Sequence, residues 1–315
     1  MAVEYILGID GGGTKTLGRL EQLSSGKIFE QDGGSSSLTN DFEGACVTLM
    51  QLIQGLCAQA NCQPSQVSVV MGLAGAGNTS QVARLKRRLA LPFIQFEVYN
   101  DARTSLFGAG LGKPVAMVAL GTGSVGARLD AKQQEHYVGG WGFPIGDEGS
   151  GAKMAFHAVQ LLLNELDRYQ TPKSRLAQSL NSRIGPDKDD ILNWLRDAKP
   201  ADYAELTPLL FELTDTCPQA DKVLRQHIQD VEQLIKLAMH EQDIPVVLMG
   251  GLAKNTMAHL SSEFTRFCQL QTGSSIDGAC YLAKQQLQTI DNKALNKEVK
   301  PLEVSTSEQD MQRAL

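Results

Sequence analysis

The sequence Asp-Gly-Gly-Gly-Thr-Lys-Thr, residues 10–16, follows an alternating apolar segment typical of a β-strand, residues 3–9. Two more glycine turns follow short apolar segments in the same way: Gly-Thr-Gly-Ser at residues 121–124 and Gly-Gly-Leu-Ala at residues 250–253. Glycine occurs wherever the backbone needs a positive φ, so one such turn says little about function. Three of them at strand ends predict a cleft in which backbone N–H groups meet the phosphates of a nucleotide such as ATP.

The order of the predicted elements occurs twice along the chain. The first copy consists of three strands, a helix and a strand that ends in a glycine turn, at residues 3–9, 17–23, 27–31, 41–60 and 67–75. The second copy repeats these elements at residues 115–120, 125–130, 136–138, 220–242 and 245–253. Chance similarity is the alternative, because buried parallel strands are all rich in Val, Ile and Leu. The matching order of the parts favours a duplication.

The length of 315 residues predicts two domains or one domain with an insertion. We expect a first lobe over residues 1–113 and a second over 114–290, with a helical insertion at about 150–242. A final helix at about 277–288 belongs to the second lobe or returns to the first. Residues 291–315 are polar and aperiodic, which is typical of a loosely attached tail.

Composition and charge exclude several classes of protein. The net charge is -6 and the basic residues form no stripe, which argues against nucleic acid as a main partner. No run of about 18 apolar residues predicts a membrane helix, and the N-terminus does not read as a signal peptide. Six cysteines show neither CxxC spacing nor His partners, so we expect free thiols in a cytoplasmic protein. The P-loop pattern GxxxxGK[ST] is absent from the glycine turns.

The three glycine turns resemble the two phosphate motifs and the adenosine motif of the sugar kinase/Hsp70/actin superfamily. The stretch GGWGFPIGDEGSG at residues 139–151 resembles the BadF/BadG/BcrA/BcrD ATPase family, and within it the N-acetylglucosamine and glucosamine kinases. This resemblance covers about residues 3–287. It implies an α/β fold of two duplicated actin-like (ribonuclease H-like) lobes that close on ATP and an amino sugar. It also implies Mg²⁺ as a cofactor and a homodimer.

The resemblance assigns Asp101 as the general base and as a sugar contact. Sugar phosphorylation needs a carboxylate that accepts the hydroxyl proton, but Asp101 could equally cap the helix that it begins. The other sugar contacts that the resemblance implies are Asn40, Gly140, Trp141, Gly142 and Asp147. Each has a structural alternative: Asn40 lies in a possible helix cap, Trp141 could be a core aromatic, and Asp147 could favour a helix N-terminus by its charge.

The glycine turns supply the candidates for binding ATP and its metal. Asp10 can hold Mg²⁺ through water, because Mg²⁺ keeps much of its hydration shell in proteins. Lys15 could contact phosphate, but solvation is the favoured interpretation. The residues predicted to offer backbone or hydroxyl donors, or close approach to the nucleotide, are Gly12, Gly13, Thr14, Thr16, Gly121, Thr122, Gly123, Gly250 and Gly251.

The resemblance implies that the chain phosphorylates N-acetylglucosamine, at the 6-hydroxyl, with glucosamine as the alternative substrate. The Gly-Trp-Gly pattern at residues 140–142 favours N-acetylglucosamine. Two other classes stay open: an ATPase that activates a dehydratase or reductase through an iron–sulfur cluster, and a non-enzymatic actin-like protein. The cysteines lie in predicted helices and strands rather than in a cluster-binding turn, which argues against the activator. A scaffold would have no evident use for Asp101.

Overall fold

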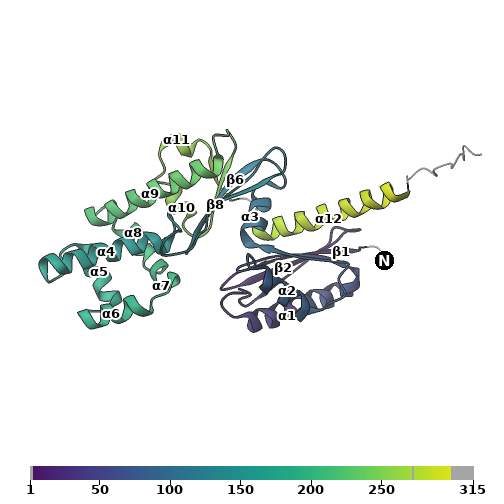
Figure 1. Cartoon of the computed structure of the whole chain (residues 1–315), viewed down its shortest axis with the longest axis horizontal. Helices are drawn as coiled ribbons and strands as arrows, with labels where there is room; N and C mark the ends of the chain where they lie inside the picture. The colour runs from purple at the N-terminus through teal and green to yellow at the C-terminus, as the bar shows by residue number, and fades with distance from the viewer. Residues whose placement is uncertain (1–2, 272, 299–315) are drawn as a thin grey trace, which may run out of the picture.

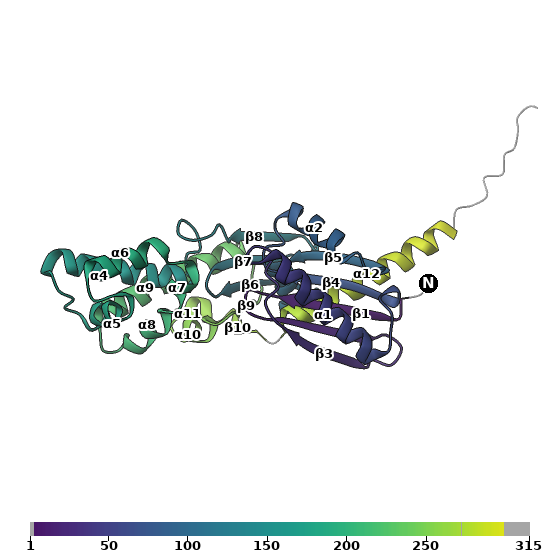
Figure 2. The ribbon, with the colours of Figure 1, turned by 90° about the horizontal axis from the view of Figure 1, so that it is seen from below.

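The computed structural model describes residues 3–271 and 273–298, the last ten of them as backbone only. It contains two lobes, each built on a five-stranded mixed sheet (Figures 1 and 2). The strand orders are β3-β2-β1-β4-β5 and β10-β9-β6-β7-β8, so the second sheet repeats the topology of the first. This confirms the predicted α/β fold of two duplicated actin-like lobes.

The first lobe begins with an antiparallel meander and continues with parallel strands. Its elements are β1 (Tyr5–Gly11), β2 (Thr16–Gln22), β3 (Ile28–Gly33), α1 (Phe42–Ala60), a 3₁₀ turn (Pro64–Gln66), β4 (Val67–Leu73), α2 (Thr79–Leu89), β5 (Gln95–Asn100) and α3 (Asp101–Gly110). β1 pairs antiparallel with β2 and parallel with β4, in a register that sets Asp10 opposite Gly72. β1 and β4 read as nearly continuous apolar runs because helices cover both faces of the sheet.

The second lobe repeats this plan. Its elements are β6 (Val115–Leu120), β7 (Ser124–Leu129), β8 (Glu135–Gly139), α9 (Pro218–Met239), β9 (Val246–Met249), α10 (Ala253–Met257), α11 (Ser262–Thr265) and β10 (Cys268–Leu270). A last helix, α12 (Ser275–Glu298), follows this lobe in the chain. β6 pairs antiparallel with β7 and parallel with β9. The positions of β6 and β9 in their sheet therefore match those of β1 and β4.

A group of helices is inserted between β8 and α9. They are α4 (Gly151–Tyr169), α5 (Arg175–Ile184), α6 (Lys188–Asp197), α7 (Pro200–Ala204) and α8 (Thr207–Leu213). Figure 2 shows them at the end of the molecule that is far from the first lobe. The predicted insertion, residues 150–242, also includes α9. Val231, Ile235 and Ala238 of α9 pack with the second sheet, so α9 also repeats the role of α1, and the purely inserted helices end with α8.

α3 and α12 cross between the lobes in close contact. A Cβ on Gly278 of α12 would overlap the carbonyl oxygen of Thr104 in α3. Gly108 of α3 lies equally close to the carbonyl oxygen of Ser274, directly before α12. α12 also packs on β1, where Gly8 faces Cys280. The final helix therefore returns to the first lobe, which was one of the two expected arrangements.

The predicted tail from Asp291 is wrong for its first eight residues, because α12 continues to Glu298. Residues 291–298 include Ala, Leu, Lys and Glu, which are good helix formers. Extending a helix that is already formed adds one hydrogen bond per residue without a new nucleation step. The segment has no apolar period because this end of α12 projects beyond the lobes (Figure 1). Residues 299–315 lie outside the described part of the chain.

Candidate active site

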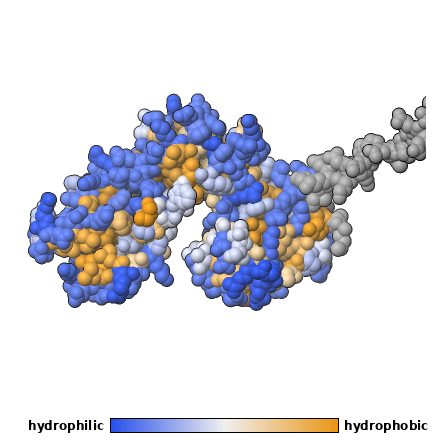
Figure 3. Space-filling view, viewed as in Figure 1, coloured by the Kyte–Doolittle hydropathy of each residue, from blue (hydrophilic) through white to orange (hydrophobic). Residues whose placement is uncertain are grey.

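A cleft of about 560 Å³ lies between the two lobes. The first lobe contributes Asn100, Asp101 and Ala102, and the second lobe contributes the turn after β6, the end of β8 and the start of the turn after β9. The space-filling view shows the hollow between the lobes (Figure 3). The predicted site residues that line this cleft together are Asp101, Gly121, Gly123, Gly140, Asp147 and Gly250.

The first glycine turn connects β1 and β2 at the edge of the first lobe. The N–H of Gly12 donates to the carbonyl of Lys15 at 3.0 Å, which closes the turn. Gly13, Thr14 and Lys15 are exposed at its tip, where their polar groups are free to meet an anion. Exposure of Lys15 agrees with the interpretation that this side chain is solvated.

Thr16 was predicted to offer a donor to the phosphates, but its side chain does not face the cleft. It is fully buried, and its hydroxyl lies 2.6 Å from the carbonyl oxygen of Gly34 and 2.7 Å from Ser36 Oγ. Ser36 in turn donates its N–H to the carbonyl of Gly12 at 3.0 Å. Thr16 therefore supports the turn from below and does not offer its hydroxyl to a phosphate. Ser36 was not predicted; the signal that could have found it is the run of small residues Gly-Gly-Ser-Ser-Ser at residues 33–37.

Asn40 lies beside the first glycine turn. A Cβ on Gly13 would be 3.5 Å from its Nδ2 atom. The cap of α1 is the next residue, Asp41, whose carboxylate accepts the N–H of Gly44 at 3.0 Å. The capping role therefore belongs to Asp41, and the Asn40 side chain is exposed next to the turn.

Asp10 and Asp101 lie near each other at the ends of β1 and β5. Burial raises the pKa of Asp10, and repulsion from Asp101 adds to this rise. A hydrogen bond from Ser275 and the charge of Lys15 act in the opposite direction. Two carboxylates that repel one another form an arrangement that a cation between them would stabilise.

Asp101 is the first residue of α3 but does not cap it. The cap is Asn100, whose Oδ1 accepts the N–H of Arg103 at 2.8 Å. The Asp101 side chain is exposed in the cleft, and its Oδ1 accepts the N–H of Ala102 at 3.0 Å. Desolvation by the surrounding protein raises the pKa of Asp101, and the backbone N–H groups of Ala102 and Asp101 moderate that rise.

The second glycine turn is anchored on the start of α4. The N–H of Gly151 donates to the carbonyl of Gly121 at 2.9 Å, and the N–H of Ala152 donates to the carbonyl of Thr122 at 3.2 Å. The Thr122 side chain itself is exposed. The N–H of Gly121 is used within the turn, where it donates to the carbonyl of Gly123 at 3.0 Å. Gly123 also admits Asp147, whose Oδ2 would lie 2.8 Å from a Cβ at that position.

The segment between β8 and α4 is a compact loop with several positive φ angles. Asp147 has a φ of 63°, and its Oδ1 accepts the N–H of Gly142 at 3.1 Å. The cap of α4 is Ser150, so Asp147 is not a capping residue. Trp141 and Ile145 are 87% and 86% exposed, which removes the interpretation of Trp141 as a core aromatic.

The third glycine turn follows β9. Gly250 has a φ of 92°, and a Cβ there would overlap the carbonyl oxygen of Leu120. No described atom lies within 4 Å of the Cβ position of Gly251, so the backbone is open to approach on that side. α10 directly after the turn is held by the buried His227, whose Nε2 lies 2.8 Å from Thr256 Oγ1. Burial lowers the pKa of His227 to about 4, so it is neutral at physiological pH.

The remaining predicted residues do not line the cleft between the lobes in this conformation. They are Asp10, Gly12, Gly13, Thr14, Thr16, Asn40, Thr122, Trp141, Gly142 and Gly251. Thr122, Trp141, Gly142 and Gly251 lie on the same turns and loops as the lining residues, whereas the first glycine turn and Asn40 contribute no lining residue. The cleft therefore brings together the predicted residues of the second and third turns with Asp101, and the assignment of the other residues to the site stays a prediction.

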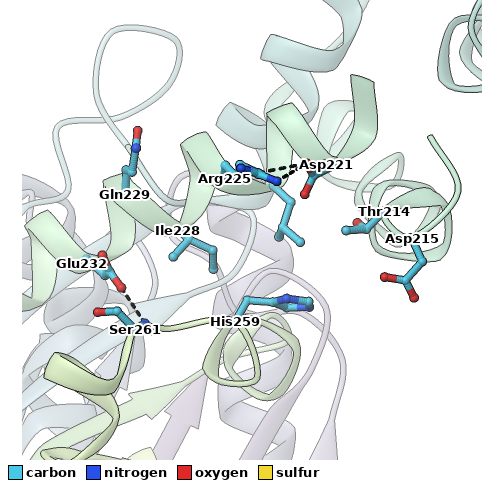
Figure 4. A pocket seen from close by; sticks show the side chains of 10 residues that line it. Thr214, Asp215, Asp221, Arg225, Ile228, Gln229, Glu232, His259 and Ser261 are labelled. Atoms are coloured by element: carbon cyan, nitrogen blue, oxygen red, sulfur yellow. Dashed lines mark hydrogen bonds and ion pairs between the residues drawn. The ribbon is translucent and has the colours of Figure 1, made fainter. Parts of the chain in front are cut away.

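A second groove, of about 430 Å³, lies along α9 (Figure 4). Three of its charged groups have partners: Arg225 pairs with Asp221 at 2.8 Å, and Glu232 accepts the N–H of Ser261 at 2.8 Å. Figure 4 shows His259 below α9, across the groove from Arg225. No predicted site residue lines this groove, so the cleft between the lobes is the candidate active site.

The chain matches proteins of known family over most of its length. It is 30% identical over 285 residues to the glucosamine kinase GspK of Vibrio cholerae, covering 89% of this chain and 96% of the relative. It is 26% identical over 275 residues to the N-acetyl-D-glucosamine kinase of Dictyostelium discoideum, covering 80% of this chain and 86% of the relative. A crystal structure from Chromobacterium violaceum, provisionally named an N-acetylglucosamine kinase, superposes with a TM-score of 0.81 at 31% identity, covering 89% of this chain and 99% of that one. The model of the BadF/BadG/BcrA/BcrD ATPase family matches residues 7–274, and the chain belongs to this family.

Proposed function

We propose that this chain is an ATP-dependent amino-sugar kinase whose main substrate is N-acetylglucosamine, phosphorylated at the 6-hydroxyl. The observation that carries the proposal is the cleft in which Asp101 of one lobe faces the glycine turns of the other. The relatives named as amino-sugar kinases support the same reaction class.

In the proposed reaction the sugar hydroxyl oxygen attacks the γ-phosphorus while the bond to the β-phosphate oxygen breaks and ADP leaves. Asp101 accepts the hydroxyl proton. The backbone N–H groups of Gly13, Thr14, Thr122 and Gly123 bind the phosphates, and Asp147 with the loop at 139–142 holds the sugar. Gly250 and Gly251 leave room for the adenosine.

Mg²⁺ belongs to this proposal through Asp10. When bound, the ion neutralises charge on the transferring phosphoryl group. The carboxylate of Asp10, close to that of Asp101, is the donor type that Mg²⁺ prefers, and contact through water suits its hydration. The backbone groups of the first glycine turn orient the phosphates beside Asp10.

Glucosamine is the second candidate substrate, because the Vibrio cholerae relative is named a glucosamine kinase. The two sugars differ at C2, where one carries an acetamide and the other an ammonium at neutral pH. The Gly-Trp-Gly pattern at residues 140–142 supports the acetamide. We therefore keep N-acetylglucosamine as the first choice.

Coupled measurement of ADP release tests the proposal. The purified chain is incubated with Mg-ATP and N-acetylglucosamine, glucosamine, N-acetylmannosamine or glucose. Selective turnover of one amino sugar is the expected result and decides between the two candidates. Slow ATP hydrolysis that no sugar accelerates would contradict the kinase and favour an activator or a scaffold.

An ATPase activator needs cysteines at a subunit surface to hold its iron–sulfur cluster. All six cysteines of this chain are free and buried in the described structure. We therefore expect purified protein without iron and without visible absorbance, measured by metal analysis and spectroscopy. Iron bound in stoichiometric amount would favour the activator.

The proposal includes a homodimer and a place in the cytoplasm. The homodimer rests on the family resemblance, and light scattering of the purified chain tests it. Six buried free thiols are typical of a reducing compartment, where ATP is also supplied. Among the described residues no helix is long and apolar enough to cross a membrane.

A further inference from the structure

Tyr137 is a large aromatic side chain on the wall of the cleft. It lies in the middle of β8, where it pairs with Ala127 of β7. It is 42% exposed and lines the same cleft as Asp101, Gly140 and Asp147. β8 leads directly into Gly139 and Gly140, so Tyr137 lies two residues before the loop that we propose for the sugar.

The hydroxyl of Tyr137 is held in place by a charged pair that joins the two lobes. It donates to Oε2 of Glu135 at 2.8 Å, and Oε1 of the same carboxylate lies 2.7 Å from Nη2 of Arg103. Arg103 belongs to α3, two residues after Asp101. Its guanidinium lies over the ring of Tyr99, 3.9 Å from the centroid, which limits its own movement.

The Arg103–Glu135 pair is less exposed than an ordinary surface ion pair. The side chains of Arg103 and Glu135 are only 31% and 20% exposed, and each oxygen of the carboxylate has a different partner. The tyrosine hydroxyl is thereby satisfied, and the ring is left as a fixed half-exposed surface. Ligand sites typically combine such aromatic surfaces with a few polar groups, here Asp101 and Asp147.

We propose that Tyr137 is a specificity-determining residue that contacts the bound sugar, and that Glu135 and Arg103 are positioning residues that hold its ring beside Asp101. This inference rests on the proposed function and adds to it a wall of the sugar site on β8. It also explains why the cation over Tyr99 is an arginine, because a planar guanidinium can stack and pair at once.

Steady-state kinetics of Tyr137→Ala tests the contact. We expect the KM for the sugar to rise about three- to tenfold, the range that an aromatic contact is worth, and the KM for ATP to stay within about twofold. Tyr137→Phe keeps the ring but loses the hydrogen bond to Glu135, so its sugar KM should rise in the same direction as in Glu135→Ala and by less than in Tyr137→Ala. Tyr169→Ala is the matched control, because Tyr169 is similarly exposed, at 47%, but ends α4 away from the cleft.

The positioning role is tested by Glu135→Ala and Glu135→Gln. Glu135→Ala should raise the sugar KM in the same direction as Tyr137→Ala, and Glu135→Gln, which still accepts the tyrosine hydroxyl, should restore most of it. If Glu135 acts through Tyr137, the double variant Glu135→Ala/Tyr137→Ala should be no worse than Tyr137→Ala alone. Additive losses would overturn the positioning role.

Calorimetric binding of the sugar without nucleotide gives a readout independent of turnover. Wild-type turnover with unchanged sugar KM and affinity in Tyr137→Ala would overturn the inference and leave the proposed function standing. Absence of turnover with every sugar in the wild type would overturn the proposed function and, with it, this inference. If Tyr137→Ala does not fold, Tyr137→Val, which retains strand propensity, decides by the same comparison.

Discussion

An aspartate at the start of a helix can act as the helix cap or as a general base, and for Asp101 the neighbouring residues distinguish the two roles. Asn100 caps α3, so the Asp101 carboxylate is not needed as the cap and lines the cleft. We expect Asp101→Ala to lower kcat by a factor of about 10² to 10⁴, the usual contribution of a general base, with ATP affinity nearly unchanged. Coupled assays and calorimetry measure the two effects. Asp221→Ala, in the second groove, is the control, and its kcat should be near wild type. A comparable loss of kcat in both variants would contradict the role of Asp101 as general base.

The raised pKa of Asp101 predicts the pH dependence of the reaction. Only the carboxylate form accepts a proton, so kcat/KM for the sugar falls as the pH falls through the pKa that Asp101 has before the sugar binds. Because desolvation raises this pKa, the acid limb should lie above about 3.9, the ordinary value for aspartate. kcat/KM for the sugar at saturating Mg-ATP, followed from pH 4 upward, measures the limb. A rate that stays level down to pH 4 would contradict the assignment.

The charge of Asp10 is needed for the proposed function but lowers the stability of the fold. Its pKa is raised by burial and by Asp101, so folding disfavours its charged form. The resulting loss of folding stability is fully present at pH values above the pKa of Asp10 in the folded chain. It disappears at pH values below the pKa of Asp10 in the unfolded chain. Asp10→Asn should therefore raise the melting temperature at neutral pH while it abolishes turnover. Thermal unfolding at pH 7 tests this, and a lower melting temperature would contradict it.

At the scale of elements, the close crossing of α3 and α12 should make a glycine-to-alanine substitution in a helix destabilising. Glycine to alanine in a helix is usually stabilising by up to about 1 kcal/mol. In Gly278→Ala the new Cβ would overlap the Thr104 carbonyl oxygen, so we expect a loss of about 1–3 kcal/mol. Urea unfolding measures it. Gly77→Ala, with no described atom within 4 Å of its Cβ position, should change little; equal stability of both variants would contradict the tight crossing.

The elements that depend on local pattern were predictable, and those that depend on a distant partner were not. β6 has the predicted bounds of Val115–Leu120 because a buried strand is apolar throughout and ends at a glycine turn. The sequence did not show which lobe α12 packs against, because its apolar face fits either sheet. In the structure, glycines 8, 108 and 278 allow the close backbone contacts that place α12 on the first lobe. Burial of Thr16 was missed because its partner, Ser36, is twenty residues away.

The three-dimensional arrangement of the whole molecule explains why only part of the predicted site lines the cleft. Asp101 and the second-lobe turns already face one another, whereas the first glycine turn and Trp141 lie outside the cleft lining. Substrates that contact both lobes favour the arrangement in which the lobes approach, because that arrangement offers the larger set of contacts. We expect such closure to exclude water as well, which otherwise competes with the sugar for the phosphoryl group.

The fluorescence of Trp141 can report the closure of the two lobes. Trp141 is 87% exposed, whereas Trp194, the other tryptophan of the chain, packs against Tyr203 with a centroid distance of 4.7 Å. Sugar and a non-hydrolysable ATP analogue should bury Trp141 and shift its emission to shorter wavelength, with a smaller radius of gyration in X-ray scattering. The variant Trp194→Phe should keep the shift, and Trp141→Phe should lose it. A shift that survives in Trp141→Phe would place the moving surface elsewhere, because Trp194 belongs to the inserted helices and not to the cleft.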